Sequence, residues 1–345
     1  MFIGPNIIYP PHCRAKRGCQ GLRPPLIIFE VILLSVLLLA FVPVDTLADA
    51  VARAEAFVLS RLGDSLRLPV LRSTAGDSFL LAGVLDTTDF GTSFFLNAAR
   101  FSPSPETREI AGRAAALLYA RRLPGDLWKY YPLRGNCLVD LDDVSSISYE
   151  LAILGYELDN LAVFHAWRDS SGGFFTWATK RADPNDIDAE VNSNVARWLF
   201  RLGYGDERFL SFLDTQVKDP SLHYCWSPLA FYYTMSRLIR DEPGAIPDSL
   251  RASWSKALVS KTLALRPHES PLNLALAANT LINLGYQGPE LDEAISALVY
   301  SQGEDGAWPG FAFYTKKTKS ETYCFGSREL TTVIVLEALY RYKSR

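Results

Sequence analysis

The sequence predicts an all-α fold, an (α/α)6 toroid of helical hairpin repeats that follows an N-terminal hydrophobic segment. Three observations support this prediction. From residue 51 onward, helical patterns alternate with loops that carry glycine and an aromatic residue. The second helix of several pairs ends in Leu-Gly-Tyr, at 154–156, 202–204 and 284–286. Few segments show the strict polar and apolar alternation that is typical of a strand.

The expected helices form two sets. Helices that begin at acidic, small or aromatic residues are expected near 89–99, 142–154, 188–202, 227–239, 272–284 and 328–342. Partner helices are expected between them, near 51–62, 108–121, 158–167, 207–216, 249–264 and 290–301. A two-helix unit that recurs at roughly 38 to 56 residues indicates a helical repeat array. A closed ring and an open solenoid both fit this pattern.

The two sets of predicted helices differ in composition, and several helices of the first set are followed by a glycine. Small residues such as Ala275 and Ala278 allow close approach, which favours an inner position for the first set. Charged residues such as Arg108 and Arg113 stripe one partner helix opposite Leu117, as on a surface helix. The glycine of Leu-Gly-Tyr is suited to the left-handed residue that ends a helix.

Two of the repeats align closely before their inner helices. Trp128 precedes Asp140 by 12 positions, and Phe174 precedes Asp186 by the same 12. At this 46-residue offset, the run Asp140-Leu141-Asp142-Asp143 superposes on Asp186-Ile187-Asp188-Ala189. The alignment therefore predicts that both acidic runs begin inner helices.

Charge and cysteine content exclude some function classes. The 345 residues include 35 Lys+Arg and 38 Asp+Glu, a formal net charge of -3. Such a chain has no general basic field, so a nucleic-acid partner is not expected. The cysteines of the main body, Cys137, Cys225 and Cys324, are odd in number and far apart. They predict neither a disulfide framework nor a closely spaced zinc site.

The N-terminus carries a targeting signal. Residues 1–25 are basic without an acid, and residues 26–43 form a hydrophobic segment that Glu30 interrupts. This order is typical of a signal peptide or a membrane anchor. Small residues at Ala48 and Ala50 would permit cleavage before Val51. In either case the toroid domain, residues 51–345, is expected on the non-cytoplasmic side of the membrane, exported or anchored through 26–43.

Two short motifs carry a resemblance to a known family. Tyr300-x-Gln302-x3-Gly306-x-Trp308 matches the second half of the QW repeat motif, although Ser296 and Ala297 stand where its basic residue and glycine belong. Residues 140–143 match the Asp-x-Asp-Asp motif of class II terpenoid cyclases. Together with the repeats, the chain resembles the terpenoid cyclase and prenyltransferase toroid superfamily, represented by squalene–hopene cyclase, over 51–345.

The resemblance implies a chemistry and a set of residues. Asp142 would donate a proton to an alkene or epoxide of an isoprenoid lipid, and Asp140 and Asp143 would adjust the pKa and orientation of Asp142. A dry cavity and neighbouring carboxylates keep such an acid protonated. No cofactor and no metal are implied. The alternative is that these acids serve only as helix caps. The recurrence of acids at Asp186 and Asp188 favours this alternative.

Aromatic residues of the loops are candidates for binding the substrate and its cations. The rings are Trp128, Tyr130, Tyr131, Phe174, Phe175, Trp177, Tyr224, Trp226, Tyr323 and Phe325. We select as substrate-binding candidates Trp128, Tyr131, Phe174, Trp177, Asp186, Asp188, Tyr224 and Trp226. Packing between helix pairs is the alternative role for each ring.

Two other function classes remain open at this stage. The chain has residues for one toroid, so a membrane, a second copy in a homodimer or the N-terminal segment would have to close the cavity. Exported carbohydrate hydrolases and lyases also use (α/α)6 barrels with paired carboxylates. In that case Asp142 or Asp186 would pair with Glu269 or Glu329. The third class is a catalytically inactive toroid that binds a lipid or a peptide.

Overall fold

The computed structural model describes residues 44–74, 83–86, 88–131, 138–179, 185–265, 270–318 and 320–345. They belong to one compact unit, Ala40–Arg345. The predicted basic and hydrophobic segments, 1–25 and 26–43, lie outside the described residues, as do Cys137 and Glu269. Among the described helices, none combines the length and the apolar character needed to cross a bilayer.

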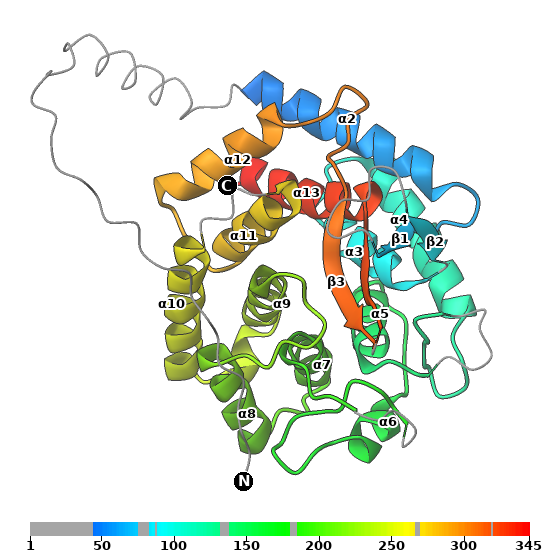
Figure 1. The fold of residues 1–345 in the computed structure, drawn as a ribbon, viewed down its shortest axis with the longest axis vertical. Helices are drawn as coiled ribbons and strands as arrows, with labels where there is room; N and C mark the ends of the chain where they lie inside the picture. The colour runs from blue at the N-terminus through cyan, green and yellow to red at the C-terminus, as the bar shows by residue number, and fades with distance from the viewer. Residues whose placement is uncertain are drawn as a thin grey trace, which may run out of the picture. The chain divides into compact units, whose positions relative to one another are not determined.

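Six inner helices form a closed ring, so the predicted toroid is confirmed and the open solenoid is excluded. Each inner helix packs against the next in chain order, and the last packs against the first (Figure 1). The ring consists of α3 (Phe90–Ala99), α5 (Leu141–Ile153), α7 (Ala189–Arg201), α9 (Pro228–Asp241), α11 (Pro271–Asn283) and α13 (Arg328–Lys343).

The partner helices cover the outside of this ring, as expected from their charged faces (Figure 1). They are α2 (Val44–Leu62), α4 (Pro105–Ala120), α6 (Leu161–Ala166), α8 (Glu207–Lys218), α10 (Asp248–Ala264) and α12 (Pro289–Tyr300). A short 3-10 helix, η1 (Pro243–Ala245), follows α9. Helix α2 begins at Val44, seven residues before the predicted domain start at Val51.

Local sequence explains where the inner helices begin and end. Asp140 caps α5 through its side chain, and serines at 227, 270 and 327 cap three others. At the other end, Gly155 has φ +89°, and the N–H of Tyr156 donates to Leu151 O. The same geometry recurs at Gly203 and Gly285. The predicted left-handed glycine of the Leu-Gly-Tyr ending is therefore confirmed.

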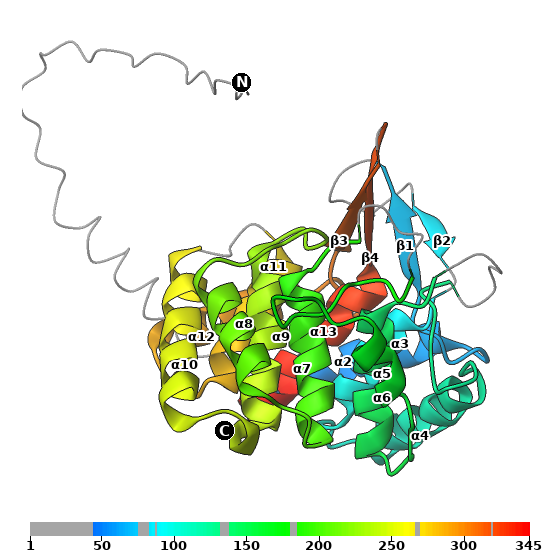
Figure 2. The same cartoon turned by 90° about the horizontal axis from the view of Figure 1, so that it is seen from below.

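A four-stranded antiparallel sheet accompanies the helices, which the sequence did not predict. Its strand order is β2-β1-β4-β3, and it stands at one end of the helical ring (Figure 2). The strands are β1 (Val70–Ser73), β2 (Val84–Asp86), β3 (Phe311–Lys317) and β4 (Thr322–Ser327). A register shift between Ala312 and Tyr314 places Ala312 and Phe313 both in buried positions, which hides the alternation of β3.

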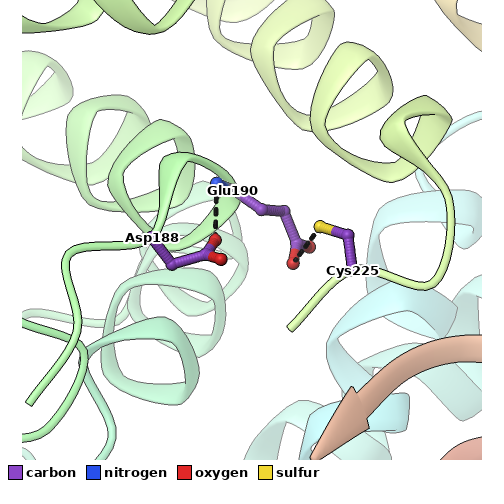
Figure 3. Close-up of side chains that lie close together, drawn as sticks. All are labelled: Asp188, Glu190 and Cys225. Atoms are coloured by element: carbon purple, nitrogen blue, oxygen red, sulfur yellow. Dashed lines mark hydrogen bonds between the residues drawn. The ribbon is translucent and has the colours of Figure 1, made fainter. Parts of the chain in front are cut away.

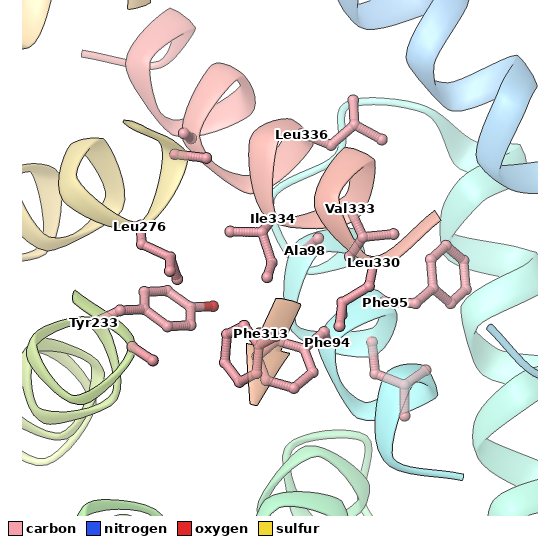
Figure 4. Packing of buried hydrophobic residues seen from close by; sticks show 14 of the residues in the cluster. Phe94, Phe95, Ala98, Tyr233, Leu276, Phe313, Leu330, Val333, Ile334 and Leu336 are labelled. Atoms are coloured by element: carbon pink, nitrogen blue, oxygen red, sulfur yellow. The ribbon is translucent and has the colours of Figure 1, made fainter. Parts of the chain in front are cut away.

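Strand β3 joins the sheet to the ring. The N–H of Thr315 donates to Tyr224 O, and the N–H of Trp226 donates to Phe313 O. Phe313 also enters the apolar core, where its ring lies 5.1 Å from that of Phe94. Figure 4 shows residues of α3, α9, α11, α13 and β3 converging there. The sheet therefore lies over the N-terminal ends of inner helices.

The opposite halves of these helices bury a network of charges. Arg197 Nη2 lies 2.8 Å from Glu150 and 2.7 Å from Asp241, and its guanidinium lies 3.6 Å from the centroid of the Tyr149 ring. Arg240 pairs with Asp241 at 2.7 Å. Because each buried charge has an opposite partner, the network fixes the helices relative to one another.

Candidate functional site

Three aspartates gather where α5 begins, below the sheet. Asp140 is the N-cap, and its Oδ1 accepts the N–H of Asp142 at 2.9 Å. Asp142 and Asp143 lie in the first turn, and both are buried. An acid in the first turn is stabilised by the helix N-terminus. Capping therefore explains Asp140, whereas it does not account for the burial of two further carboxyls.

The neighbouring helix α7 begins in the same way, but two residues later than the sequence alignment predicted. Its N-cap is Asp188, whose Oδ1 accepts the N–H of Glu190 at 2.8 Å. Asp188 is therefore the structural equivalent of Asp140, and Glu190 is the equivalent of Asp142. The 46-residue offset that paired Asp142 with Asp188 is wrong, because the loop before α7 holds two more residues.

Asp142 is held by a side chain from the neighbouring helix. Asn194 Nδ2 on α7 donates to Asp142 Oδ1 at 2.7 Å. Asp142 has 8% of its surface exposed. Burial raises the pKa of Asp142 to about 6, although the hydrogen bond from Asn194 acts in the opposite direction. Ser146 also forms a hydrogen bond with this carboxyl that lowers its pKa. Since Oδ1 accepts the N–H of Asn194, we assign the acidic proton to Oδ2.

The other acids of the cluster also favour the protonated form. Burial, reinforced by the Asp142 carboxyl, raises the pKa of Asp140 to about 8. Burial and then repulsion from Asp142 and Asp188 raise the pKa of Glu190 well above its usual range. The positive charge of Arg237 on α9 lowers the pKa of both Asp142 and Glu190. The cluster therefore retains protons near neutral pH.

Aromatic rings form most of the wall around these acids. Tyr314 and Phe325 stack with centroids 4.8 Å apart, and Tyr130 meets Tyr131 edge to face at 4.6 Å. Among the described residues, the lining is formed by Phe90, Tyr130, Tyr131, Asp140, Asp142, Asp143, Thr176, Trp177, Glu190, Val191, Tyr224, Tyr314, Thr315, Lys316 and Phe325. Four carboxyls thus face a largely apolar pocket.

A lysine side chain and two aromatic side chains joined by a hydrogen bond lie at the rim of the pocket. Lys316 Nζ lies 5.4 Å from the centroid of the Trp177 ring, a cation–π contact. Trp177 Nε1 donates to Tyr224 OH at 3.1 Å, and that hydroxyl donates to Asp186 at 3.1 Å. Strand β3 supplies Lys316, so the unpredicted sheet contributes directly to the site.

Several candidates from the sequence line this pocket and others do not. Asp140, Asp142, Asp143, Tyr131, Trp177 and Tyr224 line it. Trp128 is buried instead against α4, where its Nε1 donates to Leu118 O at 3.2 Å. Phe174 packs 4.9 Å from Phe209. Asp186 lies outside the lining, where its side chain accepts the hydroxyl of Tyr224 and its backbone oxygen accepts the N–H of Thr176. Trp226 is 43% exposed outside the lining.

Asp188 has the capping role that the sequence analysis gave as the alternative, and it also binds a neighbouring loop. Its Oδ1 accepts the N–H groups of Glu190 and Val191, and its Oδ2 accepts those of His223 and Tyr224. The carboxylate therefore ties the loop before α9 to the start of α7. All four lone-pair positions of this carboxylate are occupied by backbone donors.

Asp188, Glu190 and Cys225 are a group whose ligand atoms lie within 4.8 Å of one another (Figure 3). Cys225 Sγ donates to Glu190 Oε2 at 3.5 Å. Because the oxygens of Asp188 already accept four N–H groups, only one carboxylate and one thiol remain to bind an ion. This set is short of the three or four ligands of a typical zinc site.

Glu190, Asn194, Tyr314 and Lys316 are site residues that the sequence analysis missed. Glu190 would have been found by aligning the N-cap aspartates, since Asp140 and Asp188 begin equivalent helices. Asn194 belongs to the site through its contact with the neighbouring helix, which no local pattern indicates. Tyr314 and Lys316 had no such signal, because the bulge conceals their strand.

The QW-like run stabilises the ring. Gln302 Nε2 donates to Ala50 O at 2.8 Å and to Gly306 O at 2.9 Å. Trp308 is fully buried, and its Nε1 donates to Leu298 O at 2.8 Å. Trp128 makes the same kind of contact in an earlier repeat. These residues join a loop to its helices and lie outside the pocket.

Comparison with known proteins gives structural similarity only. No protein-family model and no curated protein sequence matches the chain. The apo structure of the type II terpene cyclase MstE from Scytonema aligns with a TM-score of 0.66 and 14% identity, covering 86% of this chain and 98% of that one. A variant of MstE in complex with its substrate, geranylgeranyl dihydroxybenzoate, aligns with a TM-score of 0.64 and 15% identity, covering 87% and 98%.

Two further solved structures show how far the structural similarity extends. ent-Copalyl diphosphate synthase from Streptomyces platensis aligns with a TM-score of 0.53 and 16% identity, over 74% of this chain and 50% of that one. An unsaturated glucuronyl hydrolase specific for heparin aligns with a TM-score of 0.57 and 11% identity, over 87% and 97%. The protein therefore has the α/α toroid fold that class II terpene cyclases share with carbohydrate hydrolases of this kind.

Proposed function

We propose that the protein is a class II-type cyclase that protonates an isoprenoid lipid from Asp142. The observation that carries the proposal is the buried carboxyl of Asp142, bound on one oxygen by Asn194 and facing an aromatic pocket. Structural similarity to class II terpene cyclases supports a cyclase-like enzyme at a coarse level.

The first step is proton transfer to an alkene. The O–H bond at Asp142 Oδ2 breaks, and the π electrons of the alkene form a new C–H bond. A tertiary carbocation and the Asp142 carboxylate result. Protonation of a weak base such as an alkene requires a neutral acid in a dry site, and burial raises the pKa of Asp142 accordingly.

The pocket walls suit the carbocation that follows. Neighbouring alkenes of the same chain attack the cation in turn, closing rings and moving the charge along the substrate. The faces of Tyr314, Phe325 and Trp177 stabilise positive charge through their quadrupoles without reacting as strong nucleophiles. Loss of a proton at the last cation completes an isomerisation.

A substrate with a long hydrocarbon chain fits this environment. MstE binds geranylgeranyl dihydroxybenzoate, an isoprenoid attached to an aromatic head. Because 98% of the MstE chain aligns with this one, the two toroids are similar in extent. We therefore extend the proposal to isoprenoid lipids of this size, with the charged rim at Lys316 nearest to the polar end.

The test is turnover by the purified full chain in detergent. Geranylgeranyl dihydroxybenzoate, squalene, oxidosqualene and polyprenyl lipids are incubated with the protein and with Asp142→Asn, and products are identified by mass spectrometry. We expect a cyclic isomer of one substrate from the wild type and none from the variant. Asp248→Asn, which changes an exposed acid on α10, is the matched control and keeps activity. Equal turnover by Asp142→Asn would refute the role of Asp142.

A carbohydrate hydrolase is the second candidate, favoured by the similarity to the glucuronyl hydrolase. The expected pairing with Glu329 gives way to another, because Glu329 pairs with Arg61 at 3.6 Å and lies outside the pocket lining. Glu269 lies outside the described residues, so a pairing with it stays a prediction. Asp142 and Glu190 would form the carboxyl pair instead. Release of sugar from unsaturated glucuronyl oligosaccharides, with no lipid turnover, would replace the cyclase proposal.

A further inference from the structure

Glu190 is a carboxyl group that lines the pocket from the inner helix α7. It occupies on α7 the position that Asp142 occupies on α5, and both line the same space. Glu190 is 3% exposed. Because α5 and α7 are adjacent in the ring, the two acids face the substrate from neighbouring directions.

One oxygen of Glu190 has no protein partner. Oε2 accepts the Cys225 thiol at 3.5 Å, as Figure 3 shows, whereas Oε1 is buried and accepts no hydrogen bond within the described structure. A buried acceptor without a partner is uncommon in proteins, since its desolvation is not compensated. The nearby Asp188 is different, because backbone donors occupy both of its oxygens.

The charges around Glu190 determine how readily the carboxyl groups of Asp142 and Glu190 lose their protons. Asp142 and Asp188 repel an ionised Glu190, and Arg237 favours it. Two ionised carboxylates in this pocket repel each other, so ionisation of one raises the pKa of the other. In the form that protonates the substrate, Asp142 holds a proton and Glu190 is a carboxylate and therefore a base.

We propose that Glu190 accepts the proton that ends the cyclisation and returns it to Asp142. This inference rests on the proposed cyclase function. The C–H bond next to the last cation breaks, its electrons form a C=C bond, and the proton binds Glu190 Oε1. Transfer of that proton from Glu190 to the Asp142 carboxylate restores the starting state. The cycle consumes no proton from solvent and needs no co-reactant.

The experiment measures products and pH profiles of Glu190→Gln, whose amide keeps the shape of the side chain. Without the base, we expect the rate to fall by about 10²-fold or more. The remaining product is expected to shift to alkene isomers or to an alcohol formed by water capture. We expect a bell-shaped profile of kcat/KM for the wild type, because both the doubly protonated and the doubly ionised pair would be inactive. Glu190→Gln loses the acidic limb.

Two other variants separate this role from a structural one. Cys225→Ala removes the thiol that lowers the pKa of Glu190, so the acidic limb moves to higher pH and the product stays the same. Glu290→Gln changes an exposed glutamate on α12 and leaves rate, product and profile unchanged. Thermal unfolding verifies that each variant is folded.

The outcomes distinguish this inference from the proposed function. If the wild type cyclises, Asp142→Asn does not, and Glu190→Gln gives the wild-type product at the wild-type rate, the role of Glu190 is wrong and the cyclase proposal stands. If the folded wild type yields no cyclic product from any of the lipids, both proposals fail. A changed product together with a lost acidic limb supports both.

Discussion

Asp142 and Glu190 occupy the same position on neighbouring helices, two residues after an aspartate that caps the helix. In each case the N–H of the acid donates to the capping carboxylate, at 2.9 Å and 2.8 Å. The repeat thus provides a scaffold in which one aspartate stabilises the helix start and the next acid is free to point into the ring. Asp140 therefore has the structural role of capping the helix, and Asp142 has the proposed chemical role.

The contact between Asn194 and Asp142 gives the first prediction. Asn194→Leu removes the N–H that binds Oδ1 and that lowers the pKa of Asp142. We expect the alkaline limb of kcat/KM to move to higher pH, because Asp142 then keeps its proton longer. We also expect a loss of about 10-fold to 100-fold in the maximal rate, because the carboxyl is no longer oriented.

Asn279→Leu is the control for loss of a buried amide. Asn279 lies on the inner helix α11, and its Nδ2 donates to Ile334 O at 2.9 Å, outside the pocket lining. This variant is expected to lose stability without a change in the pH profile. An unchanged profile in Asn194→Leu would show that the amide does not act on the acid.

The second prediction concerns stability and pH. The pKa of Asp140 is about 8 in the folded protein and about 3.9 in an unfolded chain. The native state therefore binds more protons between these values, and its stability falls as pH rises from about 4 to 8. Asp140→Asn still caps α5, since asparagine is an equivalent cap.

The variant should lose less stability over this range. We expect Asp140→Asn to match the wild type near pH 4 and to exceed its free energy of unfolding by at least about 1 kcal/mol at pH 8. Urea unfolding at pH 4, 6 and 8 measures this difference. Parallel curves for the two proteins would mean that Asp140 is not buried as a neutral acid.

Most of the fold could be predicted from the sequence, because each inner helix carries local signals. Asp140 begins helix α5, and the glycine after Leu154 ends the same helix, as expected. These interactions span only a few residues, so sequence patterns reveal them. Ring closure depends instead on the contact of α13 with α3, which lie far apart in the chain. No local pattern encodes such a contact.

The candidate site was predictable only in part, for the same reason. The Asp-x-Asp-Asp run identified Asp140, Asp142 and Asp143, which the structure brings into one pocket. Asn194 is a site residue because α7 packs beside α5, and Tyr314 because a bulged strand crosses the ends of the helices. Trp128 looked equivalent to other loop rings, but its indole is used to join its own helix pair.

The third prediction concerns the buried charges at the other end of the ring. Arg197 is 1% exposed and pairs with both Glu150 and Asp241. Arg197→Met leaves these carboxylates with less compensation in a dry environment. We expect the free energy of unfolding to fall by about 3–5 kcal/mol, measured by urea unfolding at pH 7.

Arg168→Met is the surface counterpart. Arg168 forms a two-pronged contact with Asp206, at 2.5 Å and 2.7 Å, and both side chains are partly exposed. Solvent screens such a pair, so its loss is expected to cost no more than about 1 kcal/mol. Equal losses in the two variants would contradict the distinction between the buried and the exposed pair.

The fourth prediction concerns the N-terminus, where we propose that the chain is not cleaved before Val51. Cleavage before Val51 would remove the start of helix α2, which includes the buried residues Leu47 and Ala50. It would also remove the carbonyl of Ala50, which accepts a hydrogen bond from Gln302. Because these residues belong to α2, which packs against α13 of the ring, a protein that keeps residues 44–50 is favoured over one that is cleaved before Val51.

Protein purified through a C-terminal tag from membranes of the producing cell provides the test. We expect peptide mass spectrometry to find peptides that cross residues 44–50 intact. We also expect a chain that begins at Val51 to unfold about 2 kcal/mol more easily in urea, since it lacks the buried Leu47 side chain and its neighbours. A mature N-terminus at Val51, in a protein as stable as the full chain, would show instead that residues 26–43 belong to a signal peptide.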